Sequence, residues 1–415
     1  MRRVVSFYLI GLIFFILKIR TLDSPYMFLL EYLVVFCFIL FIFALLFINT
    51  LHTETFQDNS LHCIERCFFK VVLVASILIS YGTLLSVFGG CDLNRSIKIA
   101  GLFLPIGLFP VFAYAFPEKK DWILLFFIMV IEGFISALID LYAFQNMQEN
   151  VVRLMSEEFS SIDHFYALIT AILLLLLYPF PWKISVILFA SLPFLLYRMF
   201  LAISRGEAVF LFLTLIYGII ISLFVLKKGN LKKIAFLASL FMICLIFYKF
   251  MGMSGIVEDY TKAYQFRAEK TEDAAQLRWI EFLDAIKYGG FLGTGWATEG
   301  DFSNVFSSSY LPMRYNVHNM IGYIIWKFGF IIGCGIIVSS LIYLIRQFYV
   351  NVYTKDTLGF VISGLFIVWF LHAMVNTYYM RADLNIWVAA WLGYFYRRNL
   401  WIHTTSTEKG IHNSF

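Results

Sequence analysis

Residues 318–345 read HNMIGYIIWKFGFIIGCGIIVSSLIYLI, an apolar run long enough to cross a lipid bilayer as one helix. A helix satisfies all of its backbone polar groups internally, so uninterrupted apolar runs of about 17 to 25 residues predict transmembrane helices. The whole chain shares this character, because 61% of its 415 residues are hydrophobic, 19% are aromatic and only 14% are charged. In soluble proteins the apolar share is closer to about half. The composition therefore predicts an all-α polytopic membrane protein.

Outward from this run, similar apolar segments recur and predict about twelve transmembrane spans. The expected spans are 4–17, 26–50, 69–88, 97–116, 122–144, 164–180, 184–203, 207–226, 231–251, 318–345, 357–375 and 383–396. The first of these imitates a signal peptide, but no small-x-small cleavage site follows it, so we read it as a retained span. The chain then divides into nine spans in 1–251, a loop in 252–317, three spans in 318–396 and a tail in 397–415.

The orientation follows from the lysines and arginines of the short loops, which favour the cytoplasmic side. With both termini inside, the inside segments hold about twice as many of these cations as the short outside loops. We therefore predict a bacterial inner-membrane protein with cytoplasmic termini. Some cations then lie on the outer side, where this rule does not favour them, so their presence needs a separate explanation. They include Arg95, Arg198, Arg205 and Arg381.

The loop 252–317 faces the periplasm in this arrangement. It is too long for a plain connection between packed helices, and loops of this length are usually functional or disordered. Residues 276–287 have helical spacing, with Leu277, Ile280 and Leu283 on one face, which predicts an ordered surface helix. Four glycines in 289–295 predict a turn, either a plain tight turn or one beside a ligand or hinge.

Several kinds of chemistry have no signature in this sequence. There is no phosphate-binding loop of the G-x-x-x-x-G-K-[ST] type and no dinucleotide fingerprint, so nucleotide hydrolysis is not the expected energy source. His62, Cys63 and Cys67 lack the second pair of ligands that a zinc site needs. The outside loops hold no metal-spaced carboxylate cluster. We expect a protein that uses no metal or cofactor and binds no nucleic acid.

Three residues at the outer face are candidates for chemistry. Arg205 opens a span and therefore lies close to the hydrocarbon of the bilayer. An arginine in such a place forms an ion pair, here with Glu207, or extends its side chain to the membrane surface, or lines a polar cavity. Arg278 lies on the loop helix, where a local ion pair with Glu281 is the alternative to ligand binding. His318 lies where the chain re-enters the membrane, which suits a general base, although a lone histidine is more often structural.

These residues together predict group transfer from a substrate that carries phosphate. A guanidinium binds phosphate through two parallel hydrogen bonds and stays charged at physiological pH. The histidine would serve as the base for an acceptor hydroxyl. A lipid-linked diphosphate as donor would carry its own energy source, in agreement with the missing nucleotide motif.

The order of these elements resembles the O-antigen ligase and polymerase superfamily. The resemblance covers about residues 200–340 and rests on Ser204-Arg205, the long loop, Arg278-Trp279, Gly293-x-Gly295, and His318-Asn319 followed by Gly329 and Gly333. It implies a metal-independent, inverting glycosyltransferase that uses an undecaprenyl-diphosphate-linked glycan as donor. By this resemblance Arg205 and Arg278 hold the diphosphate, and His318 activates or orients the acceptor hydroxyl.

Further residues have a weaker claim to substrate contact, and no motif ties them down. They are Arg95, Arg198, Arg381, Asn319 and Trp296. Interfacial anchoring is the competing interpretation for the loop aromatics. Glu31, Glu132 and Asp140 within spans are expected to be interior pairs or cavity residues and receive no role.

Two reactions fit this resemblance about equally. A ligase passes glycan to lipid A-core, whereas a polymerase passes it to another lipid-linked repeat unit. The resemblance also leaves room for a chain-length regulator and a flippase as partners. The rival class is a polysaccharide flippase or another multi-span transporter, which predicts internal repeats and does not require one outsized outer loop.

Overall fold

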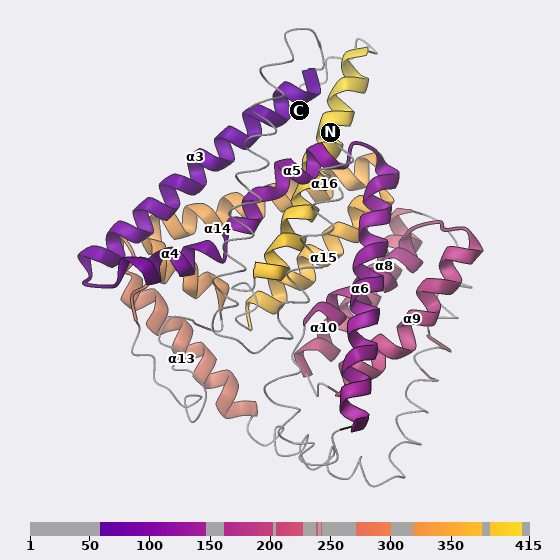
Figure 1. Cartoon of the computed structure of the whole chain (residues 1–415), viewed down its shortest axis with the longest axis horizontal. Coiled ribbons are helices and arrows are strands. Elements are labelled where there is room, and N and C mark those ends of the chain that lie inside the picture. Colours follow the sequence, from indigo (N-terminus) through magenta and orange to yellow (C-terminus); the bar gives the residue numbers. More distant parts are fainter. Residues whose placement is uncertain are drawn as a thin grey trace. The chain divides into compact units, whose positions relative to one another are not determined.

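The structure is a computed structural model of the chain (Figure 1). It describes residues 59–146, 162–201, 205–226, 238–239, 242, 271–299, 317, 319–375 and 382–408. The regular secondary structure in these ranges is helical, and no strand occurs in them. The predicted all-α fold is therefore confirmed. The expected spans 4–17 and 26–50, and nearly all of 231–251, lie outside the described residues.

The helices follow the apolar runs of the sequence. They are α3 (Asn59–Phe88), α4 (Leu93–Gly101), the 3-10 helix η1 (Leu104–Leu108), α5 (Phe109–Ala115), α6 (Lys119–Asn146), α8 (Ile162–Leu177), α9 (Trp182–Leu201), α10 (Arg205–Ile220), the π-helix η2 (Ile221–Val225), α13 (Thr271–Gly289), α14 (Met320–Thr354), α15 (Thr357–Ala373) and α16 (Ala382–Glu408). The surface helix expected at 276–287 is present as part of α13.

Five described helical segments are long and apolar enough to cross a membrane. They are Arg66–Phe88, Lys119–Leu138, Trp182–Met199, Glu207–Val225 and Met320–Thr354. α8 and α15 are shorter apolar helices, of 16 and 17 residues. A helical membrane protein is thus supported, whereas the expectation of twelve spans extends beyond what these helices establish.

The span expected at 97–116 is a bent pair of helices rather than one straight helix. α4 and the segment Leu104–Ala115 meet at an angle of 48°. Pro105 and Pro110 lie in the first turns of η1 and α5, where a proline starts a helix but cannot continue the preceding one. The side-chain amide of Asn385 donates a hydrogen bond of 2.7 Å to the Leu102 carbonyl. This contact satisfies a backbone group that the bend exposes.

The chain forms two compact units. The first comprises Met1–Trp122, Leu283–Ile337 and Thr377–Phe415, and the second comprises Ile123–Phe282 and Val338–Asn376. In the first unit α16 packs along η1 and α5. Gly393 allows this close approach, because an added Cβ would fall 2.7 Å from the Phe109 carbonyl oxygen. The Trp122 indole packs edge-on against Tyr394, with ring centroids 5.6 Å apart.

In the second unit α8 is the central helix and is surrounded by α9, α10 and α15. Each residue from Phe165 to Leu177 is at most 3% exposed. A helix that is apolar on all faces is expected in such a central place. Gly218 and Gly364 let neighbouring helices approach closely, because an added Cβ would meet Leu176 or Leu173.

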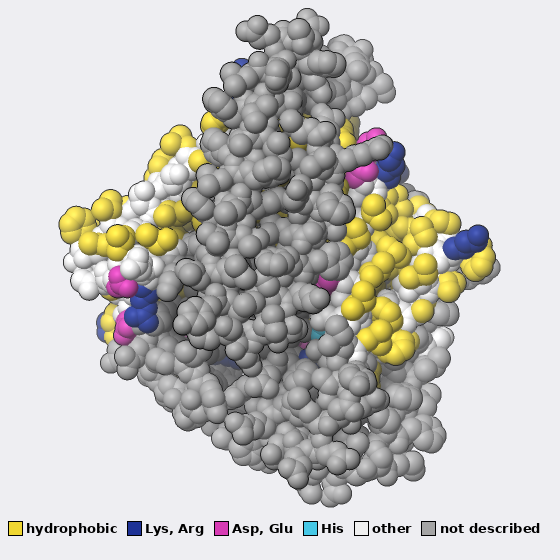
Figure 2. All heavy atoms as spheres, viewed as in Figure 1, with side chains coloured by type: hydrophobic (Ala, Val, Ile, Leu, Met, Phe, Trp, Pro, Cys, Tyr) yellow, Lys and Arg dark blue, Asp and Glu magenta, His cyan; other side chains and the backbone are white. Residues whose placement is uncertain are grey.

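The outer helices present apolar side chains to their surroundings. On α3, Leu73 is 61% exposed, Ile77 57% and Phe88 85%. In Figure 2, hydrophobic side chains predominate among those coloured, and charged side chains gather in small groups. Large exposed apolar areas are unusual on soluble proteins and are expected where lipid is the solvent.

Candidate functional site

α14 is broken near its start, and the break organises the site in the first unit. Gly329 has φ 78° and ψ 170°, far from helical values. The break removes helical partners from nearby carbonyls, and a glycine-rich turn supplies new ones. Thr294 N–H donates to Trp326 O, and Gly295 N–H donates to Lys327 O, each at 3.0 Å. In return, Phe330 N–H donates to Gly290 O at 2.8 Å. The turn and the broken helix thus satisfy each other.

The glycines of this turn are required by both conformation and space. Gly293 and Gly295 have φ 84° and 89°, in the region that side chains rarely adopt. A Cβ on Gly293 would overlap the Lys327 carbonyl, and a Cβ on Gly295 would overlap Gly82 O. A Cβ on Gly329 would overlap Phe291 O. The glycine cluster is therefore a turn packed against a broken membrane helix, which is more than a plain tight turn.

Beyond the tip of the turn, residues 292–299 run along the end of α3 and on to α4. Successive contacts mark this course: Leu292 O accepts from Tyr81 Oη at 2.6 Å, Trp296 N donates to Gly82 O at 3.1 Å, Ala297 N donates to Ser86 Oγ at 3.0 Å, Thr298 Oγ1 lies 3.9 Å from Cys91 Sγ, and Glu299 meets Arg95. This 292–299 segment brings Thr298 of the long loop beside Cys91 in the connection between α3 and α4.

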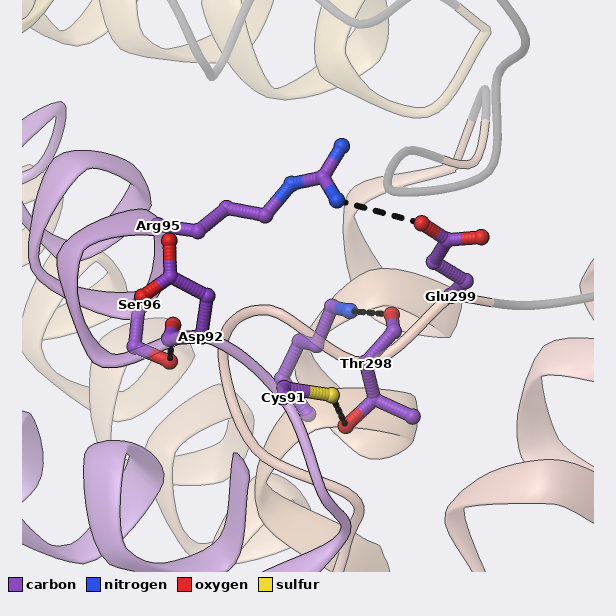
Figure 3. Close-up of polar contacts among 7 residues, drawn as sticks. Cys91, Asp92, Arg95, Ser96, Thr298 and Glu299 are labelled. Atoms are coloured by element: carbon purple, nitrogen blue, oxygen red, sulfur yellow. Dashed lines mark hydrogen bonds and ion pairs between the residues drawn. The ribbon is translucent and has the colours of Figure 1, made fainter. Parts of the chain in front are cut away.

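The segment ends in an ion pair between Arg95 and Glu299. The Arg95 Nη1 and Glu299 Oε1 atoms are 3.1 Å apart, and the two side chains are 45% and 43% exposed. Arg95 is on α4, whose N-terminus is capped by the Asp92 carboxylate, which accepts a 3.1 Å hydrogen bond from Asn94 N–H. Figure 3 shows the guanidinium reaching across to the carboxylate. Arg95, one of the weaker predicted contacts, therefore faces a polar and accessible edge of the first unit.

Lys327 lies beneath this pair and is fully buried, at 0% exposure. Its Nζ donates a 2.7 Å hydrogen bond to the Thr298 carbonyl and lies 3.3 Å from the centroid of the Trp326 ring. Among the residues described here, no carboxylate lies within ion-pair distance of this ammonium. Sequence reasoning missed Lys327, although it is the single charged residue between Met320 and Ile345. That isolation in an apolar run was the available signal.

Asn319 has a structural task at the start of α14. Its Oδ1 accepts a 3.0 Å hydrogen bond from Gly322 N–H, as an N-cap side chain does. His318, its neighbour in the chain, and Arg381 lie outside the described residues. The predicted role of His318 therefore rests on its position just before this capped helix.

Trp296 fills the core beneath the turn. It is 4% exposed, and its ring packs against Phe103 and Phe328 with centroid distances of 5.5 and 4.8 Å. Gly82 leaves room for the indole, because a Cβ there would fall 2.6 Å from Trp296 Cδ1. Within the described part of the loop, exposed aromatic side chains include Phe291, at 75%, and Tyr288, at 48%.

The second unit holds a buried arginine and a buried glutamate that interact electrostatically. Arg198 on α9 is 3% exposed and Glu207 on α10 is 6% exposed. The charge of Arg198 acts on the Glu207 carboxylate. Arg205 begins α10, but its side chain lies outside the described set, so its predicted diphosphate contact stays a prediction. The sequence-based alternative for Arg205, a pair with Glu207, likewise stays a prediction, and the structure adds Arg198 as a residue whose charge acts on Glu207.

Arg278 lies on α13 and is half-buried, beside Trp279, which is 60% exposed. Of the three residues with the strongest predicted roles, Arg278 is the one whose side chain the structure describes. The convergence of Arg205, Arg278 and His318 on one cavity remains a prediction.

Two buried histidines in the second unit also escaped sequence reasoning. His164 Nδ1 lies 3.1 Å from Gly133 O, next to the buried Glu132. His372 is 0% exposed and packs against the rings of Phe165 and Phe210. Buried polar residues of membrane helices are functional candidates by default.

No family model matches this chain, and no curated protein sequence matches it either.

Proposed function

We propose that this protein is a glycosyltransferase that moves a glycan from an undecaprenyl-diphosphate carrier to an acceptor hydroxyl at the periplasmic face of the bacterial inner membrane. The observation that supports it most is the arrangement in the first unit. The broken membrane helix α14, the glycine turn and the cations Arg95 and Lys327 come together there, and α14 begins two residues after His318 in the sequence. Irregular backbone at membrane depth is tolerated where it is buried in protein or lines a cavity.

The reaction needs a base and two diphosphate-binding cations from the chain. The acceptor oxygen attacks the anomeric carbon, the bond from that carbon to the diphosphate oxygen breaks, and undecaprenyl diphosphate leaves with the bonding electron pair. His318 would take the hydroxyl proton. Arg205 and Arg278 would hold the diphosphate and stabilise its developing charge. The acceptor is either lipid A-core or a second lipid-linked repeat unit.

Complementation tests this proposal. Cells that lack the gene receive the wild type, His318→Ala or Arg278→Ala, and their lipopolysaccharide is separated on a gel. Lys287→Met is the matched control for Arg278→Ala, because Lys287 is an exposed cation on the same helix. We expect loss of long-chain bands with His318→Ala and Arg278→Ala and a full ladder with Lys287→Met.

The pattern of loss separates the acceptors. Core that carries a single repeat indicates a polymerase, and bare core with long glycan accumulating on undecaprenyl diphosphate indicates a ligase. Full ladders with both His318→Ala and Arg278→Ala would contradict the catalytic assignment.

One observation favours the second candidate, a transporter. Both α14 and the α4–α5 pair are interrupted, and transporters use broken helices at their substrate sites. A flippase predicts a different product in the deletion strain, namely single repeat units that stay on the lipid carrier at the cytoplasmic face. Protease or lectin access to the glycan in sealed, oriented vesicles distinguishes this outcome.

A further inference from the structure

The burial of Lys327 does not stabilise the folded protein in any evident way. A charged side chain loses its hydration when it is buried, and a single carbonyl with an aromatic face replaces only part of it. Methionine has a similar length and would fill the same space without this cost. A lysine at this position is therefore expected to serve another purpose.

That purpose is visible in the contacts of Thr298. Its Oγ1 lies beside the Cys91 thiol (Figure 3). Its carbonyl accepts from Lys327 Nζ, and its hydroxyl donates to the Thr294 carbonyl. Thr298 is thus held by the helix break, by the turn and by the α3–α4 connection. The next residue is Glu299. Contacts that hold Thr298 in place therefore also hold the backbone from which the Glu299 side chain extends.

We propose that Lys327 is a positioning residue that holds Thr298 so that Glu299 and Arg95 together form the contact for the hydroxyl groups of the acceptor glycan. This inference rests on the proposed function. It assigns Glu299, which sequence reasoning did not single out, to the substrate side of the site. Lys327 acts through Glu299 and touches no substrate itself.

The Arg95–Glu299 pair suits this role by its chemistry and its exposure. An exposed ion pair adds little to stability, so its value lies elsewhere. The carboxylate accepts hydrogen bonds and the guanidinium donates them, and neighbouring sugar hydroxyls need both kinds of partner. Charged groups also form stronger hydrogen bonds than neutral ones. Both side chains are nearly half exposed, which leaves them accessible to a ligand.

The reactivity of Cys91 reports directly on whether Lys327 holds Thr298 in place, an interaction that we call the clamp. A variant that keeps Cys91 and carries serine at Cys37, Cys63, Cys67, Cys244 and Cys334 is placed in nanodiscs and treated with a membrane-impermeant maleimide. Lys327→Met should release Thr298 from its place beside the thiol. We expect labelling of Cys91 to become about tenfold faster, which corresponds to the loss of one buried hydrogen bond. Lys287→Met should label at the wild-type rate.

A folded Lys327→Met protein that labels at the wild-type rate would overturn the clamp. If Lys327→Met gives no folded protein, Lys327→Arg replaces it, because this variant keeps a hydrogen-bond donor for the Thr298 carbonyl. Slow labelling of folded Lys327→Arg supports the clamp, and fast labelling overturns it.

A double-mutant cycle tests the link to the acceptor. Glycan transfer is measured with lipid-linked repeat unit extracted from the deletion strain as donor, and with the same material or core lipopolysaccharide as acceptor. We expect Glu299→Gln and Lys327→Met each to raise the acceptor KM about tenfold with little change in kcat, and the double variant to be no worse than Lys327→Met alone. Additive effects, or an unchanged acceptor KM in either variant, would overturn the inference.

The two measurements separate this inference from the function on which it rests. If the wild type transfers no glycan to either acceptor, the proposed function fails, and with it the role of Glu299. The labelling rates still decide whether Lys327 holds Thr298. If transfer occurs and labelling does not respond to Lys327→Met, the function stands and the positioning role falls.

Discussion

Each unit of this protein contains an arginine–glutamate pair, and the two pairs lie in opposite surroundings. In the first unit Arg95 and Glu299 are nearly half exposed and join segments far apart in the chain. In the second unit Arg198 and Glu207 are almost fully buried and lie on helices that are consecutive in the sequence. The chemistry of the groups is the same, so the difference lies in their hydration.

Hydration decides what each pair can do. Two charges in water attract weakly, and a polar ligand can share or replace either partner at little cost. Two charges in a low-dielectric interior depend on each other, because a lone charge there has lost its water without compensation. The exposed pair is therefore suited to binding, whereas the buried pair is suited to holding α9 and α10 together. Arg198 is for this reason a weaker candidate for substrate contact than Arg95.

The largest expected effect comes from breaking the buried pair. Arg198→Met should leave the Glu207 carboxylate buried without its counter-charge, which costs about 3–5 kcal/mol in comparable cases. Removing both charges, as in Arg198→Met with Glu207→Met, should restore most of the lost stability. Thermal unfolding in detergent measures both variants. A melting temperature unchanged in Arg198→Met would contradict the importance of the pair.

An intermediate effect is expected at the break in α14, on which the exposed pair depends. Gly329→Ala introduces a side chain at φ 78° and against Phe291 O, so we expect a loss of about 1–3 kcal/mol and a displaced turn. Gly335→Ala is the matched control in the same helix, because an added Cβ there meets no atom within 4 Å. Thermal unfolding and Cys91 labelling measure the outcome. Equal behaviour of the two variants would refute the packing role of Gly329.

The smallest effect on stability is expected at the exposed pair. Glu299→Gln should change the free energy of unfolding by at most about 1 kcal/mol, because ion pairs at the surface contribute little. The same variant should shorten or remove the long-chain bands of lipopolysaccharide in complemented cells. Loss of stability comparable to that of Arg198→Met would show that the two pairs do not differ as described.

The helices of this protein were largely predictable from its sequence. Long apolar runs at 69–88, 122–144, 184–203 and 318–345 predicted helices where α3, α6, α9 and α14 lie, since crossing a lipid bilayer requires such runs. The expected span 97–116 is bent, and its prolines were the visible reason. The run at 318–345 gave no comparable sign of its break. Glycine is common in membrane helices, and residue type alone does not distinguish Gly329, with its non-helical backbone, from the helical Gly335.

The candidate site was predictable in part. Arg95 was named as a candidate contact, and the glycines of 289–295 were predicted to form a turn. Trp296 and Asn319 were named as contacts, and the structure shows one packed in the core and the other capping a helix. Residue type and position in the chain cannot distinguish these tasks, because each depends on which distant segment lies alongside.

By itself the sequence determined that the chain is helical and belongs in a membrane, because the length of an apolar run and the need to satisfy the backbone act locally. Only the tertiary structure decided that residues 292–299 run along α3, that Lys327 holds Thr298, and that Glu299 meets Arg95. These contacts join residues about 30 to 200 positions apart, and packing selects such pairs through fit and hydration rather than through a repeated spacing.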